Sequence, residues 1–136
     1  IPIGKNMLAQ LAEVYRKLRN TARYMLGNLN EFTPADRVDY ENLSQLDKYV
    51  LHRLQEVVQE VKEDFDNYEF FKYYQLLQNF CIVDLSSFYF DIVKDRLYTD
   101  AKKSTRRLAI QTVLHEVLQV IVRLLAPVTP HLAEDI

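Results

Sequence analysis

Residues 105–125, which read TRRLAIQTVLHEVLQVIVRLL, decide the fold. Apolar residues recur there every three or four positions, so they cover one wide face of a helix. These residues are Ile110, Val113, Leu114, Val117, Leu118, Ile121, Leu124 and Leu125. A face this wide predicts the most central helix of an all-α domain. Ala126-Pro127 predicts the end of this helix, and Thr129-Pro130 predicts the start of another.

Two further helices are predicted upstream from the same periodicity. One extends from about Asn6 to Leu26, and Gly27-Asn28 predicts a left-handed C-cap at its end. The other follows a predicted N-cap at Ser44 and continues to about Asp66. Their apolar stripes comprise Leu8, Leu11, Tyr15, Leu18, Ala22 and Met25 in the first, and Leu46, Val50, Leu54, Val57, Val61 and Phe65 in the second. The connection over residues 28–43 is long, which indicates that it contacts another part of the structure.

Residues from Tyr68 onward predict either two helices or one kinked helix. Asp84 is a candidate N-cap if there are two. The side chains expected to point inward are Phe71, Tyr74, Leu77, Phe80 and Cys81, then Leu85, Phe88, Tyr89, Ile92 and Val93, with Phe70, Tyr73 and Leu76 widening the face. Only two Gly and four Pro occur in 136 residues, which argues against many short strands. We therefore predict one all-α domain over residues 1–136, a bundle of four to five long helices.

The net charge is −2, but its distribution along the sequence is uneven. Residues 5–27 carry five bases and one acid, residues 31–69 carry four bases and eleven acids, and residues 94–107 carry six bases and two acids. If the two basic stretches meet in space, they form a positive pole, so the acidic total does not exclude nucleic acid as a partner. The lone Cys81, in an apolar run, is expected to be buried and fits a reducing, cytoplasmic setting. No apolar run approaches the about 20 residues of a membrane helix, so we expect no membrane partner.

Catalytic signatures are absent from the sequence. The only glycines, Gly4 and Gly27, form no phosphate-binding loop, and no basic residue is near Cys81 in sequence to activate it. His52, His115 and His131 do not make the Glu-x-x-His pairs of helical metal sites, so we expect neither a metal nor a cofactor.

One side of the first helix combines three RNA-binding chemistries. Arg16, Lys17 and Arg23 can pair with phosphates, Asn20 can read a base edge, and Tyr24 can stack on a base. A solvated basic face would have the same composition, so this alternative stays open. Arg19, at the edge of the apolar stripe, is a candidate to pair with an acid of a neighbouring helix.

Three blocks of the sequence resemble the helical anticodon-binding domain of isoleucyl-tRNA synthetases. The first is AEVYRKLRNT at 12–21 with RYMLGNL at 23–29, which is similar to the opening helix of that domain. The second, NFCIVDLSSFYFD at 79–91 running into KDRLY at 94–98, is the most specific. The third, LLAP at 124–127 with Pro130, His131, Ala133 and Glu134, is shared by the isoleucyl, valyl and leucyl enzymes. Because the chain also begins without an initiator Met, we expect it to be a segment of a longer enzyme.

The resemblance implies that this segment binds the anticodon stem-loop of an isoleucine tRNA and is not catalytic itself. The ATP-dependent joining of isoleucine to tRNA, with magnesium, a Rossmann-type catalytic domain, an editing domain and zinc sites, would belong to other parts of the enzyme. The expected partners are this tRNA and those domains. We assign Arg16, Lys17 and Arg23 to phosphates, Asn20 to a base edge or sugar, and Tyr24 to stacking. A possible second basic patch comprises Lys102, Lys103, Arg106 and Arg107.

Several alternatives remain at this point. The nearest is the equivalent domain of a valyl-tRNA synthetase. Another is a purely structural bundle that binds other protein domains, in which the basic strip on the first helix faces such a domain. For Lys94-Asp95-Arg96 we favour packing against the catalytic domain over RNA binding, because each base has an acid beside it. An independent enzyme is disfavoured by the missing catalytic signatures.

Overall fold

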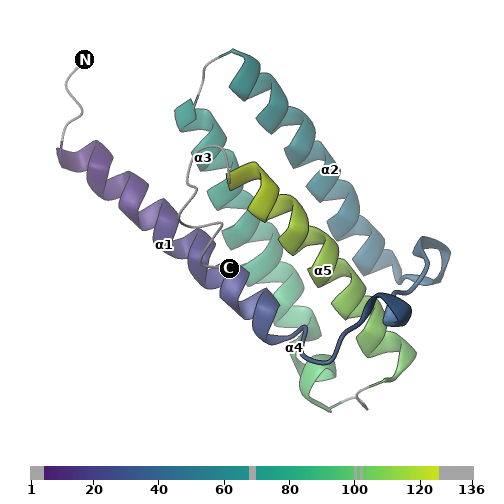
Figure 1. Ribbon diagram of the computed structural model, residues 1–136. Helices are drawn as coiled ribbons and strands as arrows, with labels where there is room; N and C mark the ends of the chain where they lie inside the picture. The colour runs from purple at the N-terminus through teal and green to yellow at the C-terminus, as the bar shows by residue number, and fades with distance from the viewer. Residues whose placement is uncertain (1–4, 68–69, 100, 102, 126–136) are drawn as a thin grey trace.

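The computed structural model describes residues 5–67, 70–99, 101 and 103–125, and their regular structure is entirely helical. The helices are α1 (Lys5–Gly27), α2 (Gln45–Asp66), α3 (Phe70–Asn79), η3 (Phe80–Tyr89), α4 (Phe90–Thr99) and α5 (Thr105–Leu125). Two short 3₁₀ turns, η1 (Pro34–Asp36) and η2 (Tyr40–Asn42), interrupt the connection between α1 and α2. The predicted all-α bundle is confirmed. Figure 1 shows α5 lying between α1 and α2, alongside the long helix that α3, η3 and α4 form together.

The segments α3, η3 and α4 are one continuous helix, and η3 is its π-helical middle. Asp84 lies inside this helix, so its prediction as an N-cap was wrong. Asn79 (φ −63°, ψ −42°) and Phe90 (φ −62°, ψ −37°), which flank the π segment, both keep helical backbone angles, so the chain never leaves the helix. The two-helix alternative is thereby excluded.

The π segment also explains why two side chains expected in the core are outside it. Phe88 and Ile92 are 40% and 44% exposed. Hydrogen bonds from i to i+5 put more residues into each turn, so positions extrapolated with the 3.6-residue period rotate away from the core. The other inward positions expected here are confirmed, because Cys81, Leu85, Tyr89 and Val93 are buried; with Leu97 they follow a four-residue spacing.

Most of the predicted core is confirmed. The buried apolar side chains include Leu18, Ala22 and Met25 of α1, Val50, Leu54, Val57 and Val61 of α2, Leu77 of α3, and Ile110, Val113, Leu114, Val117, Leu118 and Ile121 of α5. Tyr15, Leu46, Tyr74, Leu76 and Leu124 pack against this core while remaining partly exposed. The side chains of Leu8, Leu11, Phe65, Phe70, Phe71 and Leu125, and all of Ala126, Pro127, Thr129 and Pro130, lie outside the described residues.

The connection between α1 and α2 lies against α5, as its length predicted. Gln111 Nε2 donates to the carbonyl of Asn28 at 3.0 Å, and Val38 N donates to Thr112 Oγ1 at 3.0 Å. These bonds satisfy two polar side chains that are buried on α5. Arg37 adds an ion pair to Glu116 at 3.0 Å. The connection is therefore anchored to the central helix over much of its length.

The end of α1 differs from its prediction. Neither Gly27 nor Asn28 is left-handed; the positive φ in this region belongs to Glu31, at 65°. The Asn28 side chain donates to the carbonyl of Tyr24 at 2.9 Å and so satisfies an open helix-end group without a left-handed residue.

The start of α2 is capped as predicted, because Asp47 N donates to Ser44 Oγ at 3.1 Å. The carboxylate of Asp47 does not return to the cap. It is buried and accepts a hydrogen bond from the hydroxyl of Tyr89 at 2.7 Å. Burial raises the pKa of Tyr89 well above its ordinary value, and Asp47 adds to this rise. The bond fixes the first turn of α2 to the end of η3.

By length and composition, the segment Lys72–Thr99 of the long helix could cross a membrane, which the sequence did not predict. Its apolar residues are divided between two faces. One face supplies the buried side chains of the bundle, and the other carries the exposed Val83, Phe88 and Ile92. Because a core helix of a soluble protein has the same composition, this property is weak evidence for a membrane location.

Candidate nucleic-acid interface

The predicted RNA-binding strip lies on α1, and one of its members, Tyr24, packs against the edge of the core. Arg16, Asn20 and Arg23 are exposed, whereas Lys17 and Tyr24 are partly buried. Within the described part of the chain, Arg23 has no carboxylate partner. Its guanidinium is therefore available for an external anion.

Glu13, one turn before the strip, pairs with two of its cations. Arg16 donates through Nε to Glu13 Oε2 at 3.2 Å and through a second nitrogen to Glu13 Oε1, and Lys17 Nζ lies 3.9 Å from the same carboxylate. The hydrogen bond from Arg16 is the main reason that the pKa of Glu13 lies below its ordinary value. Because solvent screens a fully exposed pair of this kind, a phosphate can displace the carboxylate.

A groove of about 380 Å³ lies between α1 and the long helix. It is lined by Asn20, Thr21, Tyr24, Ser86, Phe90, Asp91, Lys94 and Tyr98. We refer to it as the α1–α4 groove. Two members of the predicted strip, Asn20 and Tyr24, thus lie in a concave site together with polar and aromatic residues that the sequence analysis did not assign to RNA. Asp91, Lys94 and Tyr98 fall at i, i+3 and i+7, so their shared helix face was a signal available in the sequence.

Two tyrosines of this groove differ in how accessible their rings are. The ring of Tyr24 stacks on Phe90 with centroids 4.4 Å apart, so one of its faces is covered. Tyr98, near the end of α4, is 77% exposed. Burial raises the pKa of Tyr24, Tyr98 adds to the rise and Lys94 opposes it. At neutral pH, Tyr24 is therefore an uncharged hydroxyl.

Lys94 supplies a positive charge beside these rings. Its Nζ lies 3.0 Å from Asp91 Oδ1, and this hydrogen bond is the main cause that raises the pKa of Lys94. Lys94 therefore stays protonated at any pH near neutrality. The groove thus combines an amide, two phenol rings, a carboxylate and an ammonium group.

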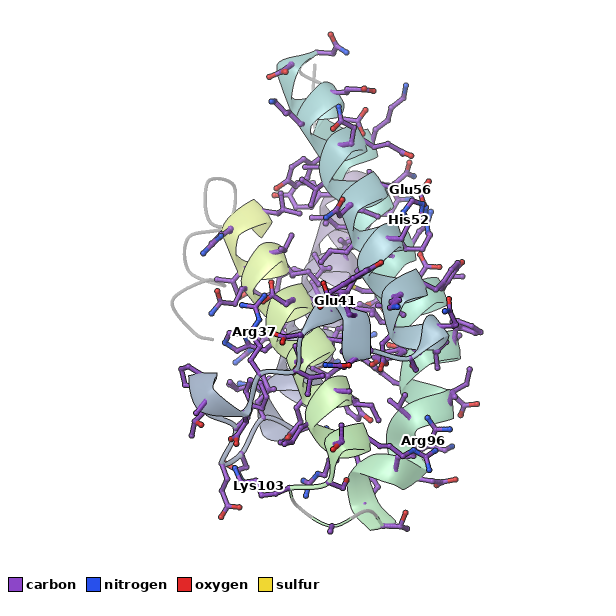
Figure 2. All side chains as sticks on the ribbon, turned by 90° about the vertical axis from the view of Figure 1, so that its right-hand side faces the viewer. Arg37, Glu41, His52, Glu56, Arg96 and Lys103 are labelled. Carbon is purple, nitrogen blue, oxygen red and sulfur yellow. The ribbon has the colours of Figure 1, made fainter. Side chains whose placement is uncertain are left out.

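The possible second basic patch is divided by the structure. Lys103 donates to Asp36 Oδ2 at 2.7 Å and to the carbonyl of Glu31 at 3.1 Å, so it anchors the α1–α2 connection; Figure 2 shows it at the lower end of the bundle, away from His52 of α2. Arg106 is exposed, and Arg107 is partly buried with an Nε that has no hydrogen-bond partner. Lys102 lies outside the described residues. Of the three described residues of this patch, only Arg106 presents an exposed cation that is not engaged elsewhere in the described chain.

Comparison with known proteins gives the family. Residues 47–136 match the family model described as the anticodon-binding domain of tRNA ligase. The chain belongs to this family. The matched residues include the α4 side of the groove, whereas α1 precedes them.

Curated relatives of this anticodon-binding domain extend over α1 as well. The chain is 56% identical to an isoleucine–tRNA ligase of Cyanothece sp. and 57% identical to one of Thermosynechococcus vestitus, and in both cases the whole chain is covered. It is 56% identical to an isoleucine–tRNA ligase of Gloeobacter violaceus over 98% of its length. The chain spans about 14% of the length of each of these relatives.

The described residues of this anticodon-binding domain line other grooves as well, and one of about 480 Å³ includes Phe32, Gln119 and Arg123. A larger groove of about 580 Å³ lies between α2, α5 and the α1–α2 connection, where Arg37 and His52 line it (Figure 2). His52 lies 3.5 Å from Glu56 on the exposed side of α2. Among the described residues, no three His, Cys, Asp or Glu side chains are grouped as metal ligands would be. His131 lies outside them.

Two predictions about single residues have different outcomes. Cys81 is fully buried, as expected, and burial raises the pKa of its thiol to about 12, so it is not a nucleophile in the folded domain. Arg19 has no carboxylate partner within the described part of the chain, and its Nε is buried without a hydrogen bond. The pairing with a neighbouring acid that its position suggested is not present there.

Proposed function

We propose that this domain binds the anticodon stem-loop of an isoleucine tRNA, as part of an ATP-dependent isoleucine–tRNA ligase. Family membership supports tRNA as the partner, and the names of the relatives support isoleucine as the amino acid. The observation that carries the proposal is the α1–α4 groove, because it combines the three chemistries that proteins use to bind single-stranded RNA loops. Those chemistries are the amide of Asn20, aromatic rings and the cation of Lys94.

Each residue of the strip has a role in this proposal. Arg23, which has no carboxylate partner among the described residues, binds a backbone phosphate, and Arg16 and Lys17 exchange Glu13 for phosphates. Asn20 binds a base edge or a sugar. Tyr24 stacks through the ring face that Phe90 leaves open. Arg106 is a secondary phosphate contact from α5.

The chemistry of the ligase would take place outside this domain. We place ATP, magnesium and zinc in the other domains, which are also its protein partners, and we place the enzyme in the cytoplasm. The domain would hold one end of the tRNA so that the acceptor end reaches the catalytic site. No residue of this chain is assigned a catalytic role.

A salt titration of stem-loop binding tests the phosphate contacts. The logarithm of the affinity should fall linearly with the logarithm of the salt concentration, and each phosphate contact removed should reduce the slope by about 1. We expect Arg23→Ala to weaken binding and reduce the slope. Lys62→Ala, which removes an exposed cation of the acidic helix α2, is the matched control and should change neither.

Two outcomes of this titration would contradict the proposed RNA contacts. If the wild-type chain does not bind the stem-loop at low salt, the proposed function fails. If Arg23→Ala and Lys62→Ala weaken binding to the same extent, the strip is not the contact surface, and a protein-docking role for it is favoured.

A further inference from the structure

Tyr98 is an exposed aromatic ring at the rim of a groove, and the predicted RNA-binding strip did not include it. It is 77% exposed, the largest exposed fraction among the large apolar and aromatic side chains of the described residues. Its helix, α4, ends one residue later at Thr99. A ring with this exposure is accessible to a partner that can stack on it.

The shape of the α1–α4 groove suits a flat, partly polar ligand. The stacked pair Tyr24 and Phe90, with ring centroids 4.4 Å apart, forms part of its lining. The exposed side chain of Asn20 lines the α1 side, and Tyr98 lines the α4 side. A volume of about 380 Å³ falls within the range of about 300–1,000 Å³ typical of small-ligand sites.

The polar groups of the groove can recognise the edge of a nucleobase. An amide offers a donor and an acceptor, which is the pattern needed to bond a base edge. Asp91 contributes a carboxylate that accepts from an exocyclic amino group, and Lys94 balances its charge at 3.0 Å. Asp95 adds a second acid nearby, whereas the exposed Arg23 adds a cation on α1. The groove itself is therefore close to neutral, which fits a base better than a phosphate.

We infer that a single unpaired nucleotide of an RNA loop inserts its base into the α1–α4 groove, where it stacks on Tyr98 and bonds to Asn20. The inference rests on the proposed function, since it names the part of the RNA that this site takes. The phosphates on either side of the inserted base then lie outside the groove, where Arg23 can reach them. Stacking on one ring tolerates any base, whereas the Asn20 amide and the Asp91 carboxylate favour a base with an amino group at its edge.

Fluorescence of an inserted base tests this directly. Anticodon stem-loops that carry 2-aminopurine at one loop position at a time are titrated with the full 136-residue chain. At one position, the fluorescence should change when the protein binds. Tyr98→Ala should abolish this change and weaken binding about 5- to 150-fold, the range for loss of one base–aromatic stack. Tyr98→Phe keeps the ring and should bind as the wild type does.

A second exposed tyrosine provides the control. Tyr40, which is 56% exposed, lies in the α1–α2 connection and outside this groove. Tyr40→Ala should leave both the affinity and the fluorescence change intact. Asn20→Ala should weaken binding while keeping the fluorescence change, because the stack remains.

The outcomes separate this inference from the proposed function. If the wild-type chain binds the stem-loop and Tyr98→Ala binds it equally well with the same fluorescence change, no base stacks on Tyr98 and the proposed function stands. Tyr98 would then be a contact for another protein domain. Equal losses from Tyr98→Ala and Tyr40→Ala would also overturn the inference. If the wild-type chain binds no stem-loop, both fail together.

Discussion

Replacing Tyr89 by Phe removes one hydroxyl from the buried contact that joins η3 to α2. Tyr89 is fully buried, and its hydroxyl lies 2.7 Å from Oδ1 of Asp47, which is itself 3% exposed. The substitution keeps the ring, and thus the packing, while it leaves a buried carboxylate without this donor. The expected effect is therefore the loss of one hydrogen bond and not the formation of a cavity.

The size of this effect follows from the type of bond. Hydrogen bonds to charged groups contribute about 1.5–3 kcal/mol to stability, more than those between neutral groups. For a domain of this length, 1 kcal/mol corresponds to about 3–4 °C in Tm. We therefore expect Tyr89→Phe to lower the free energy of unfolding by about 1.5–3 kcal/mol and the Tm by about 5–10 °C.

Urea and thermal unfolding, followed by circular dichroism at 222 nm, measure the change. Tyr98→Phe removes an exposed hydroxyl and serves as the matched control, with an expected change within about 0.5 kcal/mol. A double-mutant cycle with Asp47→Ala isolates the pairwise term. If Tyr89→Phe is as stable as the wild type, or if the two substitutions are additive, the bond does not stabilise the fold and the reasoning is refuted.

Three further predictions concern the core, the thiol and the α1–α2 connection. Leu77→Ala, at a fully buried position, should cost about 2–5 kcal/mol in urea unfolding, whereas Val83→Ala, at a position that is 57% exposed, should cost less than about 0.5 kcal/mol; similar costs would contradict the register of the long helix. Cys81, whose pKa is raised to about 12 by burial, should not react with an aromatic disulfide reagent at pH 8 until urea unfolds the domain, and rapid labelling of the native protein would contradict its burial. The hydrogen bond from Lys103 is the main reason that the pKa of Asp36 lies below its ordinary value. The pair therefore stabilises the fold at pH values above the unfolded-state pKa of the carboxyl, and this stabilisation is lost as the pH falls through the lower folded-state pKa. The Tm difference between Lys103→Ala and the wild type should shrink in acid, and a difference that stays constant would exclude the pair as its source.

Sequence periodicity was sufficient to predict the bundle because three of its long helices keep an α-helical repeat. In α1, α2 and α5, residues such as Leu18, Val57 and Val113 recur at the expected spacing and are buried. The Ser44 cap was also predictable, because a cap depends on residues within one turn. Local signals were accurate wherever the local structure was regular.

The predictions failed where tertiary contacts or helix geometry changed the local rule. No local signal announced the π segment, so Phe88 and Ile92 were assigned to the wrong face. Gly27 permitted a left-handed cap, but the Asn28 side chain bonds the helix end instead. The first error comes from extending the 3.6-residue period through a π-helix, and the second from assuming that the intrinsic preference of Gly27 decides its conformation.

The candidate site was only half predictable for a similar reason. The strip on α1 could be found from residue chemistry, because its members lie on one helix. Its opposite wall is contributed by α4, about 70 residues later in the sequence, and only the packing of the two helices brings Lys94 and Tyr98 beside Asn20. The packing also places Phe90 against one face of the Tyr24 ring. The ring of Tyr98 is therefore the more accessible surface for stacking.

The measurement that tests the central claim most directly is the affinity of this chain for two stem-loops that differ only in the anticodon. One carries the anticodon of an isoleucine tRNA, and the other carries a changed anticodon on the same stem, at a fixed moderate salt concentration. The account predicts tighter binding to the isoleucine anticodon, and a smaller difference for Asn20→Ala and Tyr98→Ala. Equal affinity of the wild-type chain for both stem-loops would contradict base reading by the α1–α4 groove and would leave only contacts to the RNA backbone.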